Sequence, residues 1–132
     1  MKPYQAVGYL LLNTTAVTAI TSTRVWHGLR PESSDTPSIS YFELGGGQRY
    51  RGMENQPIAL NCRADTPEGA RDLARVVVNL FSGDMGIRGD INGFKVGKCS
   101  LQNDNGLNPE PDDNLYNAPV DILLIYPSKT VS

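Results

Sequence analysis

The sequence predicts an α+β protein: a mainly antiparallel β-sheet with two helices packed on it, forming a single-domain sandwich. Three observations predict this class. Apolar residues recur at helical spacing in two segments, short runs of β-forming residues lie between and after these segments, and a length of 132 residues suits one core. The order of helix, strands, helix and strands favours helices gathered on one face of the sheet. We therefore treat residues 1–132 as one domain.

The first predicted helix lies at the N-terminus. Val7, Leu10 and Leu11 recur at the i, i+3 and i+4 positions that form one helical face, and the helix should end near Asn13. The following residues 14–22 (TTAVTAITS) are expected to add only a short turn against the core.

The second predicted helix is the clearest element of the chain. Thr66 is a good N-cap, Pro67 suits the first helical position, and Gly83 is a stop signal. Arg71 and Arg75 fall off the apolar face and should meet solvent or a partner. That face is one continuous stripe of residues that should supply much of the core: Ala70, Leu73, Ala74, Val77, Leu80 and Phe81.

Five segments have the composition or the alternation of β-strands, and polar or glycine-rich segments separate them. The last segment is the strongest, with alternate apolar residues from Val120 to Tyr126. Residues 45–56 should form a flexible connection, a long hairpin tip, and residues 102–117 an acidic loop. The predicted strands are 24–28 (RVWHG), 38–44 (SISYFEL), 57–64 (PIALNCRA), 94–101 (FKVGKCSL) and 118–127 (APVDILLIYP).

Composition excludes several classes of protein. Hydrophobic residues make up 39% of the chain and charged residues 20%, which is typical of a globular domain. A net charge of −2 gives no basic surface for nucleic acid, and no segment is long and apolar enough to span a bilayer. The N-terminal apolar run is too short and too interrupted for a signal peptide, so we expect a soluble protein folded in a reducing cytoplasm.

The two cysteines, Cys62 and Cys99, admit two interpretations: a disulfide, or two buried reduced thiols. We favour the thiols, because a chain of this size with two cysteines is not a disulfide scaffold. Neither cysteine has a metal-ligand neighbour at a useful spacing, since the single His27 lies far away in sequence.

Trp26 and His27 are the strongest candidates for catalysis, because each is the only residue of its type and they are adjacent. A general base needs a nucleophile and an orienting partner, and the chain has neither a Gly-x-Ser-x-Gly motif nor a second histidine. The glycines at 45–47 are not followed by the Gly-Lys-Ser/Thr of a phosphate loop. We therefore predict no enzyme activity, no catalytic residue and no cofactor, and interpret the pair as part of a strand that packs in the core or at an interface.

The stretch 104–114 (DNGLNPEPDDN) contains four carboxylates, from Asp104, Glu110, Asp112 and Asp113. A calcium loop would need a central glycine and a terminal glutamate at fixed spacing, and this spacing is absent. We therefore predict a solvated acidic loop and no metal site.

Arg49, Tyr50 and Arg51 form a basic and aromatic cluster on the hairpin tip. Such a cluster can contact nucleic acid, but Arg and Tyr are also enriched in protein–protein contacts, and we favour the second interpretation on an acidic protein. The tripeptide at Arg88–Asp90 (RGD) lies in a glycine-rich stretch and is expected to mark a loop without function. The predicted protein-contact residues are Arg49, Tyr50, Arg51, Asp104, Asp112 and Asp113.

The order of these motifs resembles the tail-completion, or tail-terminator, family of long-tailed bacteriophages. In that family an N-terminal helix leads through an Ala/Val-rich piece to a strand of the type RVW, then to a P-x-I-x-Y strand, and later to a T-x-E-A-x-x-L-A helix. The matching segments extend from Tyr4 to Pro127. Gly69 replaces the usual Ala at the helix start, and residues 45–56 and 103–114 resemble insertions. The segments are 11–28 (LLNTTAVTAITSTRVWHG), 36–44 (TPSISYFEL), 58–81 (IALNCRADTPEGARDLARVVVNLF) and 118–127 (APVDILLIYP).

The resemblance implies a structural virion protein without catalytic residues. Its members form a ring, usually a hexamer, at the head-proximal end of the tail tube, where they end tube polymerisation and join the tail to the neck. The implied partners are further copies of the chain, the tail tube protein and the head-completion (stopper) protein, with DNA passing through the lumen without sequence-specific contacts. The implied location is the tail and neck of the virion, after assembly in the host cytoplasm. Two alternatives remain: another neck or tube component, and a small ligand-binding domain.

Overall fold

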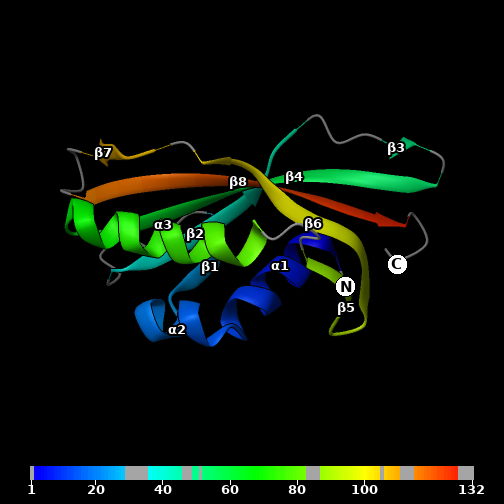
Figure 1. The fold of residues 1–132 in the computed structure, drawn as a ribbon, viewed down its shortest axis with the longest axis horizontal. Helices are drawn as coiled ribbons and strands as arrows, with labels where there is room; N and C mark the ends of the chain where they lie inside the picture. Colours follow the sequence, from blue (N-terminus) through cyan, green and yellow to red (C-terminus); the bar gives the residue numbers. More distant parts are fainter. Residues whose placement is uncertain are drawn as a thin grey trace.

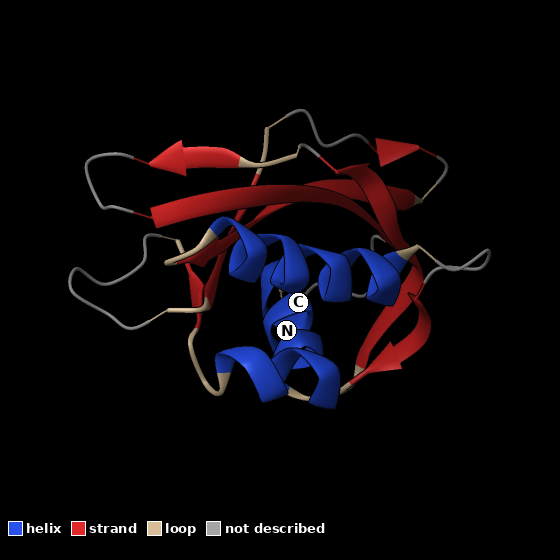
Figure 2. Ribbon diagram, turned by 60° about the vertical axis from the view of Figure 1, so that its left-hand side comes forward, coloured by secondary structure: helices blue, strands red, loops and turns tan. Residues whose placement is uncertain are grey.

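The computed structural model describes residues 2–28, 36–45, 49–50, 52–82, 87–104, 106–110 and 115–127. It confirms the α+β class: helices gather on one face of a largely antiparallel sheet (Figures 1 and 2). The elements are α1 (Pro3–Leu12), α2 (Thr15–Thr21), β1 (Val25–His27), β2 (Ser38–Glu43), β3 (Arg49–Tyr50), β4 (Met53–Ala64), α3 (Pro67–Phe81), β5 (Ile87–Ile91), β6 (Phe94–Asp104), β7 (Asn108–Glu110) and β8 (Leu115–Pro127).

The sheet is built around its two longest strands. β4 and β8 form an antiparallel ladder of 12 residue pairs, from Met53 opposite Pro127 to Ala64 opposite Tyr116. The full strand order is β1-β2-β4-β8-β6-β5, with β3 paired to β4 and β7 paired to β8. Among the strand pairs that the structure describes, β1–β2 alone is parallel. Side chains alternate between the two faces of each strand, so one set of apolar residues from β4 and β8 faces the helices.

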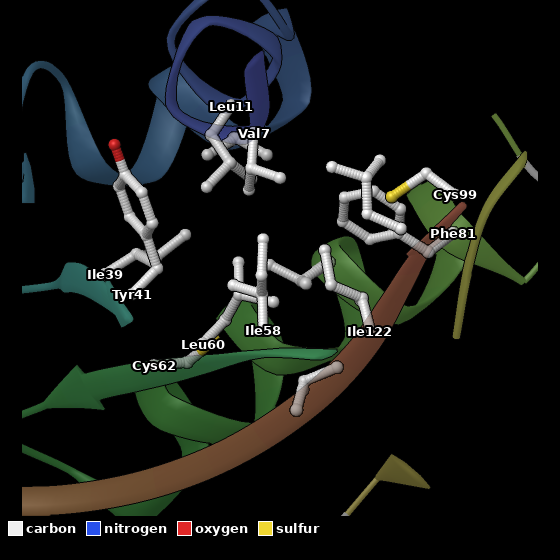
Figure 3. Close-up of a cluster of buried hydrophobic side chains, with 14 of the residues drawn as sticks. Val7, Leu11, Ile39, Tyr41, Ile58, Leu60, Cys62, Phe81, Cys99 and Ile122 are labelled. Atoms are coloured by element: carbon white, nitrogen blue, oxygen red, sulfur yellow. The ribbon is translucent and has the colours of Figure 1, made fainter. Parts of the chain in front are cut away.

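The core lies between this face and α3, as the sequence predicts (Figure 3). The apolar stripe of α3 packs on β4 and β8, although Leu80 at its edge is only partly buried. The Thr66 hydroxyl accepts a hydrogen bond of 3.0 Å from the Gly69 backbone N–H, which is the predicted N-cap. Residues without any exposed surface include Leu73, Val77 and Phe81 from the helix and Ile58, Leu60, Ile122 and Leu124 from the sheet.

The N-terminal helices cover the rest of the same face. Residues expected to form only a short turn make a third helix, α2, because Val17 and Thr21 fall on one side of it and are fully buried. The sequence therefore predicted two of the three helices that the structure describes and missed α2. α1 approaches the sheet closely at Gly8, where a Cβ atom would overlap the hydroxyl of Tyr41. A glycine at this position permits the short distance between helix and strand.

Two predicted loops contain strands. Ile87–Ile91, which includes the RGD tripeptide, forms β5 and pairs with β6. The turn between these strands has positive φ at Asn92 (49°) and Gly93 (89°), the geometry that an Asn-Gly pair favours in a two-residue hairpin. In the acidic stretch, Asn108–Glu110 forms β7 against β8.

The hairpin tip is shorter than predicted. Met53–Gln56 belong to β4 and pair with the end of β8, and Arg49–Tyr50 form β3 against Met53 and Glu54. Most described residues of the 45–56 segment therefore belong to strands β3 and β4.

Both cysteines are free and buried, which confirms the predicted thiols. Cys62 lies on β4 and Cys99 on β6, with β8 between them. Burial raises the pKa of each thiol to about 12, with Asp104 adding to the effect at Cys62. Both thiols are therefore neutral, apolar parts of the core at ordinary pH.

Candidate functional site

A groove opens between the middle of α3 and the connection from β6 to β7. Its volume is about 250 Å³. Two arginines from α3, Arg71 and Arg75, and the carboxylate of Asp104 from the end of β6 line it together with an apolar set of side chains. The apolar lining consists of Ala74, Val78, Leu107 and Ala118. The groove thus combines an apolar surface with two positive charges and one negative charge.

Arg71 and Arg75 lie one helical turn apart, and both are exposed. Within the described residues, no ion pair or hydrogen bond reaches either guanidinium, although Glu68 and Asp72 are exposed on the same helix. Two like charges at i and i+4 destabilise a helix by about 0.2–0.5 kcal/mol. Both side chains lie outside the buried core, so they contribute little to folding.

The sequence predicted only part of this groove. Asp104 was expected to be a contact residue, and Arg71 and Arg75 were expected to face solvent or a partner; all three are exposed. The three residues lie close together because β6 runs beside β8, on which α3 packs. The spacing of these residues along the sequence does not reveal this arrangement. The one feature of the sequence that could have indicated the groove is the pair of arginines at positions i and i+4 outside the apolar stripe.

The predicted contact segments lie at opposite ends of the long β4–β8 ladder (Figure 1). Near one end, β3 pairs with Met53 and Glu54, and Met53 in turn pairs with Pro127. Near the other end, β7 pairs with the start of β8, where Tyr116 faces Ala64. Twelve residue pairs at about 3.3 Å per residue separate the two ends by roughly 36 Å.

The two segments differ in charge as well as in place. Residues 45–56, which we call the hairpin arm, contain Arg49, Arg51 and Glu54 and therefore carry a net charge of +1. Residues 104–114, the acidic arm, contain four carboxylates and no Lys or Arg, a net charge of −4. Of the predicted contact residues, Asp104 is exposed at the end of β6, and the backbones of Arg49 and Tyr50 form β3. Arg51, Asp112 and Asp113 lie outside the described residues.

His27 belongs to an aromatic cluster that joins α1 to the edge of the sheet. Its ring stacks on Tyr4 with centroids 3.9 Å apart and lies 5.4 Å from the ring of Tyr41. Its Nε2 atom is hydrogen-bonded to the carboxylate of Glu43. The pKa of Tyr41 is raised, chiefly by burial and then by Tyr4 and Glu43. The adjacent Trp26 is half-buried.

Ring stacking and a hydrogen bond to Glu43 hold His27 in this cluster. Within the described residues, no hydrogen bond links His27 to a serine, threonine or cysteine side chain. Both cysteines are buried with raised pKa values, which makes them poor nucleophiles.

The described residues contain no group of three or more His, Cys, Asp or Glu side chains placed to bind a metal. None of the helices that they form has the length and hydropathy needed to cross a membrane.

Comparison with known proteins identifies the fold. No protein-family model and no curated protein matches the chain. Among solved structures, a chain from the virion of the native gene transfer agent (GTA) particle is similar, with a TM-score of 0.65 and 11% sequence identity. The similarity covers 94% of this chain and 90% of the other. The two proteins therefore share one fold over nearly their whole length.

Proposed function

We propose that the chain is a structural virion protein, the tail terminator of a long-tailed phage or a related particle. In this role, copies of the chain form a ring, with six members as in the family it resembles, at the head-proximal end of the tail tube. The ring ends tube polymerisation and joins the tail to the head-completion protein of the neck. It has no catalytic function.

The observation that carries the proposal is the placement of the two arms. A closed ring requires a heterologous contact, in which two different surfaces of each copy meet. Strand β3 of the hairpin arm and strand β7 of the acidic arm lie at opposite ends of the β4–β8 ladder, and the two arms have opposite net charge. Such a pair of surfaces suits head-to-tail association, in which one end of each copy meets the other end of the next.

The contact residues have distinct roles in this proposal. Arg49, Tyr50 and Arg51 anchor the hairpin arm, because arginine and tyrosine are enriched among the residues that contribute most to protein–protein binding. Asp104, Asp112 and Asp113 supply the negative surface. The likeness to a chain of a gene transfer agent virion supports a virion role, because the shared fold spans nearly all of both chains.

The proposal is tested by the shape and behaviour of the assembly. We expect closed rings in negative-stain images of the purified protein, and caps at one end of tubes when the protein is added to polymerising tail tube protein. The tubes should then stop growing. A tube subunit would instead form open stacks of rings, and a head-completion protein would bind heads without limiting tube length. Growth of tubes to unlimited length in the presence of bound protein would exclude the terminator role.

A further inference from the structure

We propose that an apolar patch on the helix-free face of the sheet is the surface on which Leu107 and strand β7 of a second copy of this chain pack. The inference rests on the proposed ring, because it assigns the contact between neighbours in that ring. The patch lies in the half of the β4–β8 ladder beside the hairpin arm, whereas β7 lies at the acidic end. The contact therefore joins opposite ends of two successive copies.

The patch is built by side chains that strand alternation directs away from the helices. Ile122 and Leu124 of β8 face the helices and are fully buried. Leu123 and Ile125 alternate with them, so these two side chains face the other way and are only partly buried. The neighbouring strands continue the surface in register. We define the apolar patch as Phe42, Leu44, Pro57, Leu123, Ile125 and Pro127.

The composition of the patch is that of a surface covered by protein. An antiparallel sheet with one face in water alternates apolar and polar residues along its strands. β8 breaks this alternation at Ile122–Tyr126 (ILLIY), where five successive residues are apolar. Phe42 is 38% exposed and is one of three large apolar side chains that are exposed among the described residues. Contiguous apolar surface of this kind marks a site of association.

The other half of the same face has a different character. Asn117 donates a hydrogen bond of 3.1 Å to Asn61, and Arg63 donates one to the hydroxyl of Ser40. Asp121 marks the boundary between the two halves, opposite the buried Ala59. The polar half therefore suits water, whereas the half beside the hairpin arm suits an apolar protein surface.

The acidic end of the chain supplies such a surface. Leu107 is partly exposed, Pro109 on β7 is exposed, and Tyr116, which pairs with Pro109, is partly exposed. Figures 1 and 2 show β3 and β7 on the side of the ladder away from α3. The acidic end of one copy is thus placed to overlap the helix-free face of the next copy at its hairpin end.

Charge favours the same arrangement. The hairpin arm, which adjoins the patch, has a net charge of +1. Asp104 is the first residue of the acidic arm and is exposed three residues before Leu107. Opposite charges beside an apolar contact favour the pairing of unlike ends, and like charges disfavour the pairing of two identical ends. The contact is therefore heterologous, as a closed ring requires.

The experiment removes the apolar side chains of each surface separately. The patch variant is Leu123→Thr/Ile125→Thr and the β7 variant is Leu107→Thr/Pro109→Thr, because threonine keeps strand propensity and leaves the net charge unchanged. Ring formation by each variant alone, measured by sedimentation velocity and negative stain, should fall at least tenfold. An equimolar mixture should form complexes of two copies and nothing larger. The β7 variant keeps an intact patch and the patch variant an intact β7, so one contact forms and the two altered surfaces stop growth.

A control and a second variant make the result specific. Tyr9→Gln/Leu12→Gln removes two exposed apolar side chains from α1, outside both surfaces, and should form rings like the wild type. Thermal unfolding followed by circular dichroism checks that each variant is folded. Phe42→Thr alters the patch from β2 instead of β8 and should also weaken rings, so the patch is tested even if the β8 substitutions prevent folding.

Three outcomes would overturn the inference. Normal rings from the folded patch variant or from the β7 variant would show that the altered surface is not a contact, while the ring proposal would stand. Loss of rings in both variants without pairs in the mixture would show that the two surfaces do not meet each other. If wild-type protein forms no ring either alone or with tail tubes, the ring proposal fails and this contact fails with it.

Discussion

The helix-covered face of the sheet and the two ends of its β4–β8 ladder are built from different side chains. The covered face is largely apolar, and Leu60 and Ile122 on it and Val77 on the helix above it have no exposed surface. The ladder ends carry the charged arms and, at one end, the arginine groove, whose charged side chains are exposed. The buried residues of the covered face pack against one another in one cluster, whereas Arg71, Arg75 and Asp104 near one end are exposed.

This difference indicates that stability and assembly depend on separate residues. Burial of apolar side chains is the main favourable term in folding, so substitutions on the covered face should change the free energy of unfolding. Exposed charges contribute little to folding, so substitutions at the ladder ends should change association instead. Substitutions in the two regions test this separation, from the largest expected loss of stability to the smallest.

Val77→Asp should have the largest effect. Val77 is fully buried between α3 and the sheet, so the variant places an unpaired carboxylate in the core. The expected cost is about 4 kcal/mol or more, against a total stability of about 5–15 kcal/mol for a typical domain. Chemical denaturation measures it. Arg71→Ala on the exposed side of the same helix is the control and should change stability by less than about 0.5 kcal/mol. Equal midpoints for Val77→Asp and wild type would contradict the observed orientation of the helix.

The buried thiols should make stability fall at high pH. Burial raises the pKa of Cys62 and Cys99 to about 12 in the folded protein, whereas an exposed thiol titrates near 9. Between these values the unfolded chain loses thiol protons that the folded chain keeps. Each thiol should therefore lower the free energy of unfolding by up to about 1.4 kcal/mol per pH unit as pH rises from about 9 to about 12. Below pH 8 the thiols should contribute no pH dependence.

The thiol effect is isolated by comparing wild type with Cys62→Ala/Cys99→Ala, because the two proteins have the same titratable groups apart from these thiols. The variant is less stable overall but should lose less stability between pH 9 and pH 11. Parallel curves for the two proteins would show that these thiols ionise without unfolding. Reaction with a thiol reagent should likewise require denaturation, and no free thiol after denaturation without reductant would disprove the reduced state.

Gly8→Ala should destabilise the contact between α1 and the sheet. The new Cβ overlaps the hydroxyl of Tyr41, and overpacking of this kind typically costs about 1–3 kcal/mol, partly offset by the better helix propensity of alanine. In a Tyr41→Phe background the overlapping oxygen is absent and the nearest atom is the ring Cζ at 3.0 Å, so the same substitution should cost less stability. A thermodynamic cycle over the two sites measures the coupling. An equal loss in both backgrounds would mean that the hydroxyl is not the obstacle.

The elements that the sequence could predict are those with strong local patterns. Local pattern identified α3, because an N-cap at Thr66, a proline at the first turn and an apolar stripe all agree. Strand β8 was equally clear from its alternation. α2 was underestimated because its threonines have weak helix propensity, and tertiary burial of Val17 and Thr21 decides its structure. β5 was missed although the Asn92-Gly93 pair is a strong hairpin signal.

The groove was harder to predict than the fold. It joins α3 to the β6–β7 connection, which are about 30 residues apart in sequence and meet only through the sheet. Exposed arginines and acidic loops occur on most globular proteins, so composition does not distinguish a contact surface from an ordinary solvated one. The exposed ends of the ladder, which contribute little to the core, are therefore the parts for which the sequence was least informative.

Neutralising the hairpin arm should have the smallest effect on stability and a large effect on assembly. Removing the whole of residues 45–56 would be a poor test, because Met53–Gln56 pair with β8 and belong to the ladder. Arg49→Gln/Tyr50→Ser/Arg51→Gln leaves the backbone pairing of β3 and β4 in place, so unfolding should shift by only about 0.5 kcal/mol. If the arm anchors one copy to the next, the loss of two positive charges and an aromatic ring should prevent closed rings at concentrations where wild type forms them.

The control Lys95→Gln/Lys98→Gln removes the same number of positive charges from β6 and should still close rings. Rings from the arm variant, together with normal capping of tubes, would show that the ladder end at β3 is not a contact between copies and would leave the acidic end alone as the candidate surface.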